Sequence, residues 1–137
     1  AGFMEANLQQ CNFKGAFMEM ANLYGSNLTE CNLSNTVLDR ASMQKTTMKG
    51  TNLSNASLEM AMMNEAVIEF ANFSRVNLSY ADLSHVKIFS SDFTNANLTM
   101  TKMHQVYDEK TIWSGANRAQ AQITNEKLKK AEMWGMK

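Results

Sequence analysis

The sequence predicts an all-β fold in which the chain winds into a closed coil of parallel strands. Every fifth residue from Phe3 to Met103 is Leu, Ile, Met or Phe. The residue two places before each of these is small, from Ala1 to Val106. A period of five would spiral around every face of an α-helix and would alternate faces on a flat strand. The pattern therefore requires a chain that turns a corner once in every repeat unit.

Each unit of the repeat contributes one small and one large side chain to the interior. In the unit ANLQQ we call Ala6 the small residue, Asn7 the second residue, Leu8 the central residue and Gln10 the corner residue. The small and central residues are two apart, so both side chains point to the same side, as on a strand. The corner turns the next pair inward again, and the closed coil buries a continuous apolar core.

The units resemble those of the pentapeptide-repeat family over residues 1 to about 107, as in CNLSN, ANFSR and ADLSH. The resemblance implies a right-handed quadrilateral parallel β-helix, in which four consecutive units form one coil and about five coils stack here. The sequence supports this coil length, because the central residues Phe13, Phe73 and Phe93 are separated by multiples of four units. We expect residues i and i+20 to be stacked neighbours.

Stacking of i on i+20 predicts several side-chain ladders. One face has a polar second residue in every coil: Asn12, Asn32, Asn52, Asn72 and Asp92. We expect their side chains to bond to one another up the stack. Cys11 and Cys31 should lie one above the other inside the coil. Parallel inward side chains do not suit the torsion of a disulfide, so two buried free thiols are favoured and a disulfide is the alternative.

The carboxyl-terminal part of the chain departs from the repeat. The register falters at Asp108, where the central residue becomes acidic. We therefore divide the chain into a β-helix over residues 1–107 and, over residues 108–137, an exit segment and a C-terminal capping helix that ends near Trp134. Repeat proteins need such a cap over the end of the core, and we expect Trp113 and Trp134 to form it.

The amino-terminal coil has no comparable cap in the sequence. Its central residues are all large and apolar: Phe3, Leu8, Phe13 and Met18. We expect this end to be covered either by additional chain or by a partner. An end-to-end association of two copies through this uncapped coil is one such arrangement.

The composition excludes several functional classes. The 13 acidic and 13 basic side chains give a net charge of zero, which lacks the basic footprint of a nucleic-acid-binding protein. No apolar run approaches the length of about 20 residues that spans a membrane, so no membrane insertion is expected. We find no constellation for catalysis, cofactor binding or metal binding. His85 and His104 form a poor metal site without a third ligand. An enzyme is not expected.

These observations predict a soluble, non-enzymatic protein-interaction scaffold or structural subunit that presents flat β-helix faces to a protein partner or a larger complex. The alternative follows from the resemblance, because some members of the family protect DNA gyrase by mimicking duplex DNA. Those proteins are acidic, and this chain is neutral. The resemblance also favours a bacterial cytoplasm or a plastid, either stroma or thylakoid lumen. The Asn-x-Ser/Thr triplets of the repeat argue against eukaryotic secretion, where they could be glycosylated.

One corner of the predicted rod is unusually apolar. Its corner residues, with two outward residues on the same face, form a candidate protein-binding stripe: Met20, Arg40, Met60, Tyr80, Met100, Phe17 and Val37. Contiguous exposed apolar patches tend to mark interaction surfaces, and Met, Tyr and Arg are enriched there. The alternative is that flexible Met side chains fold over the rod and shield its edge. Phe70 and Phe89 form a second, smaller apolar spot on a different face.

Overall fold

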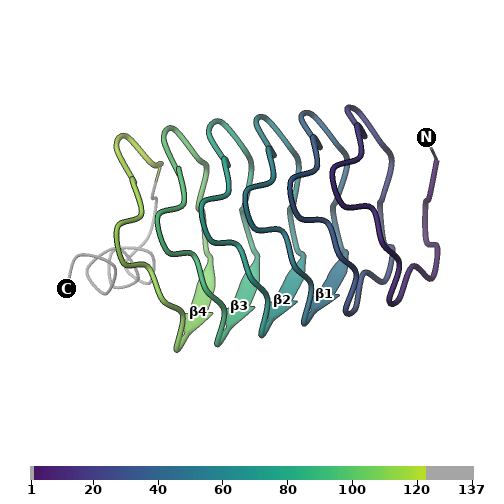
Figure 1. Ribbon diagram of the computed structural model, residues 1–137. Helices are drawn as coiled ribbons and strands as arrows, with labels where there is room; N and C mark the ends of the chain where they lie inside the picture. Colours follow the sequence, from purple (N-terminus) through teal and green to yellow (C-terminus); the bar gives the residue numbers. More distant parts are fainter. Residues whose placement is uncertain (1, 123–137) are drawn as a thin grey trace.

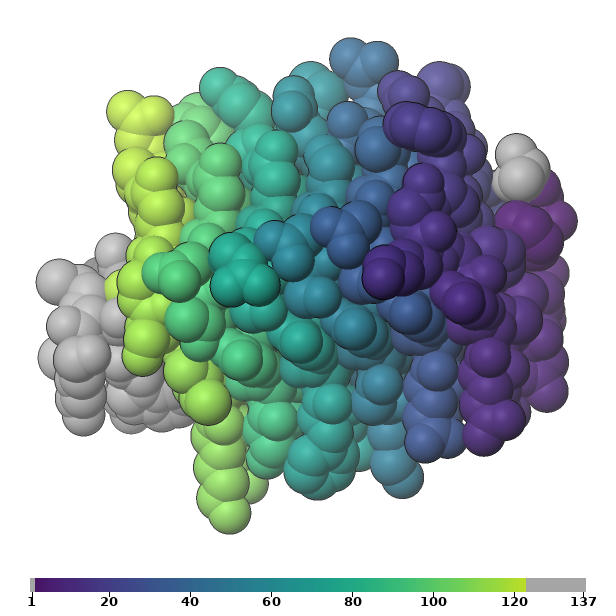
Figure 2. Space-filling model, viewed as in Figure 1, coloured from purple at the N-terminus to yellow at the C-terminus, as the bar shows by residue number. Residues whose placement is uncertain are grey.

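The computed structural model describes residues 2–122. Figure 1 shows the chain as a series of similar coils stacked along one axis, with the amino terminus at one end and the later coils at the other. In the space-filling view of Figure 2, successive coils form side-by-side bands across the surface. Sequence position therefore translates into position along the rod, and equivalent residues of adjacent coils are neighbours in space.

The pairing of the coils confirms the predicted stacking of i on i+20. The strands β1 (Thr47–Lys49), β2 (Val67–Glu69), β3 (Lys87–Phe89) and β4 (Tyr107–Glu109) form one parallel sheet in the order β1-β2-β3-β4. Each residue pairs with its equivalent four units on, as Met48 does with Ile68. The other faces are joined by single parallel bridges with the same spacing.

The interior is a continuous stack of apolar side chains. From residue 21 to residue 106, every small and every central residue is buried. The aromatic rings of Phe73 and Phe93 stack with their centroids 4.6 Å apart, and Trp113 stacks on Phe93 at 4.7 Å. Each coil thus covers the core of the coil before it, and no single coil could bury its own apolar face.

The asparagine ladder forms, but its hydrogen bonds differ from the prediction. The side-chain oxygen of Asn72 accepts the backbone N–H of Ser74 at 2.9 Å, and Asn32 and Asn52 do the same two residues on. These oxygens therefore close turns within their own coil rather than bonding up the stack. Asn side chains favour this local bond, and the backbone already supplies the bonds between coils.

One face changes from turns to strands along the rod. Its first two coils have Asn7 and Asn27 as second residues, and each side-chain oxygen accepts the N–H two residues on. The next coils have Thr47, Val67, Lys87 and Tyr107 there and form β1–β4. Thr, Val and Tyr favour extended backbone and Asn favours turns. Loss of Asn alone is not sufficient, because Phe17 and Val37 on another face form only single bridges, each followed by a turn.

Every corner residue from Glu5 to Gln120 has a positive φ, between 50° and 72°. This left-handed conformation is unfavourable for residues other than Gly, and most of all for β-branched residues. Gly occupies four of these corners, Gly15 and Gly25 among them. No corner residue up to Gln120 is Val, Ile or Thr. The corners thus restrict backbone conformation while leaving the side-chain chemistry open.

The coils extend beyond residue 107, where the sequence analysis ended the β-helix. Strand β4 pairs with β3, and the bridges continue to Lys102↔Gln122. The acidic residue at position 108 is accommodated because Asp108 is buried and its Oδ2 accepts the indole N–H of Trp113 at 2.8 Å. Trp113 itself is a central residue of a regular unit, only 4% exposed. The predicted capping helix and Trp134 lie outside the described residues.

Residues 2–122 contain no helix, and hence none that could cross a membrane.

A candidate protein-binding stripe

Backbone hydrogen bonds stack the five corner residues of the stripe one above another. Each donates its N–H to the carbonyl of the residue that precedes the equivalent corner of the next coil. Met20 bonds to Asp39 at 2.9 Å, and Met60 bonds to Ser79 at 3.0 Å. The outward residues Phe17 and Val37 are bridged to each other on the same face. The structure therefore stacks these corner residues as expected from the repeat together with the coil length that the family resemblance implies.

The side chains of the stripe are largely accessible to solvent. Phe17 is 84% exposed, Met20 71%, Tyr80 54% and Met60 44%. Arg40 is exposed as well, while Val37 and Met100 are half-buried. Met side chains that folded over the rod to shield its edge would be less exposed than Met20 and Met60 are. The exposure therefore favours a surface that is available to a partner.

An acidic ladder runs beside the stripe. Glu19, Asp39 and Glu59 are the residues that precede successive corners, and with Arg40 and Met60 they line a groove of about 110 Å³. The Asp39 side chain is fixed, because its Oδ1 accepts the Ser57 hydroxyl at 2.5 Å and the Glu59 N–H at 3.1 Å. The stripe thus combines apolar side chains with negative charge on one flank.

The second apolar spot is larger than the sequence indicated. Phe70 is 64% exposed, and its N–H donates to the carbonyl of Phe89 in the next coil at 3.0 Å. The Phe89 ring contacts the ring of Tyr107, with centroids 5.6 Å apart. Tyr107 was not predicted as part of this spot because the coils were expected to end at residue 107. Extending the coil spacing by one further coil from Lys87 would have found it.

The two cysteines are free thiols, Cys31 buried and Cys11 half-buried. Burial, followed by the charge of Cys11, raises the pKa of the Cys31 thiol to about 11. This thiol is therefore protonated at neutral pH and poorly suited to act as a nucleophile. Within residues 2–122, no group of three or more acidic, His or Cys side chains is arranged to hold a metal ion.

The repeat identifies the family of the chain. Pentapeptide repeats match it in eight copies, over residues 1–38, 21–59, 31–69, 51–88 and 71–106. These ranges cover well over half of the chain, and the chain therefore belongs to the pentapeptide repeat family. A search of curated proteins found no match.

Several solved structures are similar to this chain. HetL, a pentapeptide repeat protein involved in heterocyst differentiation regulation in the cyanobacterium Nostoc, is 24% identical over 89% of this chain and 61% of HetL, with a TM-score of 0.43. A pentapeptide repeat protein from the Arabidopsis thaliana thylakoid lumen is 17% identical over 80% and 63% of the two chains, with a TM-score of 0.39. QnrB1, a plasmid-mediated fluoroquinolone resistance protein, is 11% identical over 88% and 71%, with a TM-score of 0.39. The chain thus spans less than two thirds of HetL and of the thylakoid protein.

Proposed function

We propose that this pentapeptide repeat protein is a non-enzymatic interaction scaffold that binds a protein partner along its apolar stripe. The observation that carries the proposal is the exposure of Phe17, Met20, Met60 and Tyr80 on one continuous line. The described coils offer a rigid, regular surface on which such a line keeps its spacing. We further propose that the rod is the right-handed quadrilateral form of β-helix.

The stripe and its flank define the partner's surface. Adjacent coils are about 4.8 Å apart, so five stacked corner residues extend over about 20 Å, which suits one helix or one sheet edge. The partner should present apolar side chains to Met60 and Tyr80. It should also present basic side chains toward Glu19 and Asp39, because opposite charges at the rim of an interface steer association and select partners.

Affinity capture from a native extract of the source tests the proposal. The bait is the whole chain, and the test variant combines Met60→Glu with Tyr80→Glu. The control variant combines Asn35→Glu with Asn95→Glu, two exposed corner residues on another face with the same left-handed backbone. We expect the test variant to lose the proteins that the wild-type chain captures and the control variant to retain them. Equal capture by all three folded chains would refute the stripe as the binding surface.

A supercoiling assay addresses the alternative from the sequence analysis. A DNA mimic should be strongly acidic, whereas this chain has equal numbers of acidic and basic side chains. We therefore expect that the protein leaves the inhibition of DNA gyrase by a quinolone unchanged. Protection of gyrase at stoichiometric concentrations would replace the scaffold proposal with the gyrase-protecting function.

A further inference from the structure

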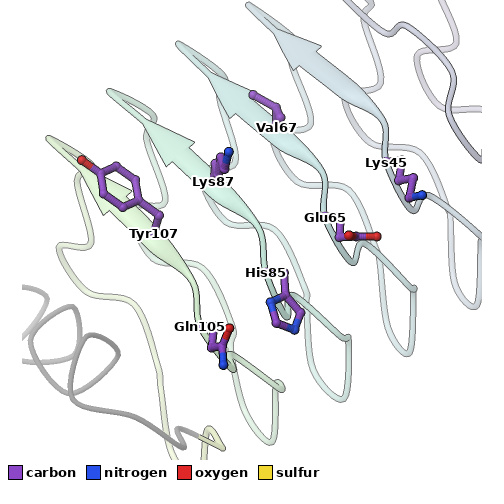
Figure 3. A pocket seen from close by; sticks show the side chains of 7 residues that line it. All are labelled: Lys45, Glu65, Val67, His85, Lys87, Gln105 and Tyr107. Atoms are coloured by element: carbon purple, nitrogen blue, oxygen red, sulfur yellow. The ribbon is translucent and has the colours of Figure 1, made fainter.

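A second groove, of about 470 Å³, lies between two ladders on the sheet side of the rod. One ladder consists of corner residues and the other of second residues on β2, β3 and β4, as Figure 3 shows. The corner ladder is Lys45, Glu65, His85 and Gln105, and the strand ladder is Val67, Lys87 and Tyr107. A volume of this size falls in the range of about 300–1,000 Å³ that holds small organic ligands.

The charges in the groove leave a basic centre. Lys45, at one end of the groove, already interacts with an aromatic ring, because its Nζ lies 5.9 Å from the centroid of the Tyr24 ring. Tyr24 and then Glu65 raise the pKa of Lys45. Glu65 is thus balanced by Lys45. Lys87 has no ion pair or side-chain hydrogen bond within residues 2–122, and His85 belongs to the same coil.

An aromatic ring is held in place beside this basic centre. The Tyr107 hydroxyl donates to Glu109 Oε2 at 2.8 Å, and its ring contacts Phe89. Tyr107 is nevertheless 46% exposed and is the neighbour of Lys87 in the sheet register. A fixed ring loses little conformational freedom when a ligand stacks on it.

We propose that this groove binds a small planar organic anion, an aromatic carboxylate or an aromatic phosphate. The anionic group lies at the Lys87 ammonium, where the His85 ring also donates a hydrogen bond. The planar part of the ligand packs against Tyr107 and Val67, and the Gln105 amide supplies a further donor. The site is separate from the apolar stripe and does not depend on the proposed function.

A titration followed by two-dimensional NMR of the ¹⁵N-labelled protein tests this site. The probes are benzoate and phenyl phosphate. Benzamide, which has the ring without the charge, and inorganic phosphate, which has the charge without the ring, are the controls. We expect saturable shifts of the Lys87 and Tyr107 amides with one or both aromatic anions, and much weaker binding of benzamide and of inorganic phosphate. Preference for benzoate would identify a carboxylate ligand, and preference for phenyl phosphate would identify a phosphate ligand.

Variants distinguish binding in this groove from a nonspecific attraction of anions to any lysine on the surface. Lys87→Gln should weaken binding of the preferred aromatic anion about tenfold, the loss expected for one charge-assisted hydrogen bond. Lys49→Gln removes an exposed lysine from the same sheet outside the groove and should leave binding unchanged. Tyr107→Leu should abolish the advantage of phenyl phosphate over inorganic phosphate. The proposal is wrong if no aromatic anion saturates, or if Lys87→Gln and Lys49→Gln have equal effects.

Discussion

Two corners of the rod have the same backbone and opposite surfaces. The apolar corner contains Met60 and Tyr80, both with φ near 60°. The polar corner contains Asn55 and Asn95, with φ of 60° and 58° and the same stacking from coil to coil. Asn tolerates the left-handed conformation better than Met or Tyr does. The coil therefore does not require apolar corners, and the apolar stripe calls for an explanation outside the fold.

The largest effect should come from the core that both corners share. Phe93 is fully buried between the rings of Phe73 and Trp113. Phe93→Ala should lower the free energy of unfolding by about 3–5 kcal/mol, measured by urea denaturation. The two corners should unfold together, as reported by fluorophores attached separately at Met60 and Asn55. A loss below about 1 kcal/mol would show that the aromatic stack does not support the coils.

A smaller effect should be common to both corners because it comes from the backbone. Met60→Ile and Asn55→Ile place a β-branched residue at positive φ and should each cost about 1–2 kcal/mol of unfolding free energy. Met60→Leu is the control, since it keeps an unbranched Cβ and the apolar character. Equal stability of the Ile and Leu variants at position 60 would contradict the left-handed corner.

A charge in the interior should destabilise the fold, whereas a charge at an exposed corner should not. Burial raises the pKa of Asp108, an effect partly offset by its hydrogen bonds. A carboxyl whose pKa is raised by folding contributes most stability below its unfolded pKa, and stability falls as pH rises through the folded pKa. Asp108→Asn should therefore raise the unfolding free energy at pH 7, because the amide does not ionise in the buried site. It should also flatten the decrease in unfolding free energy that the wild type shows as pH rises above about 4, the ordinary pKa of an Asp side chain. An unchanged pH profile would show that Asp108 is not desolvated.

The smallest effect on stability should come from charge at the apolar corner. Met60→Glu with Tyr80→Glu changes two exposed side chains, and the unfolding free energy should stay within about 0.5 kcal/mol per site. Thermal denaturation alongside Asn35→Glu with Asn95→Glu checks this expectation. A much larger loss at the apolar corner alone would mean that its side chains stabilise the rod and are not reserved for a partner.

The interior could be predicted from the sequence, and the surface only in part. A small and a central residue in every unit determine which side chains point inward. The coil length that the family resemblance implies then predicted the stacking of Cys11 on Cys31 and of Phe73 on Phe93. The end of the coils was misplaced because Asp108 breaks the apolar pattern. Its hydrogen-bond donor, Trp113, cannot be identified as such from the sequence. The direction of the Asn72 bond was also wrong, because residue spacing carries no information about which of two nearby donors an amide oxygen meets.

The groove at Lys87 was missed for a related reason. Its two ladders come from a corner and from the following strand, so the residues that share the groove do not share a position in the repeat. A charged and polar pair of ladders has no apolar pattern that would mark it as a surface feature in the sequence. The repeat also gave no sign that the faces differ in backbone conformation, whereas one face changes from turns to strands within residues 2–122.

Site-specific photo-crosslinking tests the central claim most directly. A photoreactive amino acid replaces Met60 or Tyr80 on the apolar corner, and Asn55 or Asn95 on the polar corner, in otherwise wild-type chains that are irradiated in native extract. The backbone, register and exposure of the two corners are matched, so only their surroundings differ. We predict that one protein is crosslinked from positions 60 and 80 and not from positions 55 and 95. The same crosslinked protein from both corners, or none from the apolar corner, would contradict the proposed function.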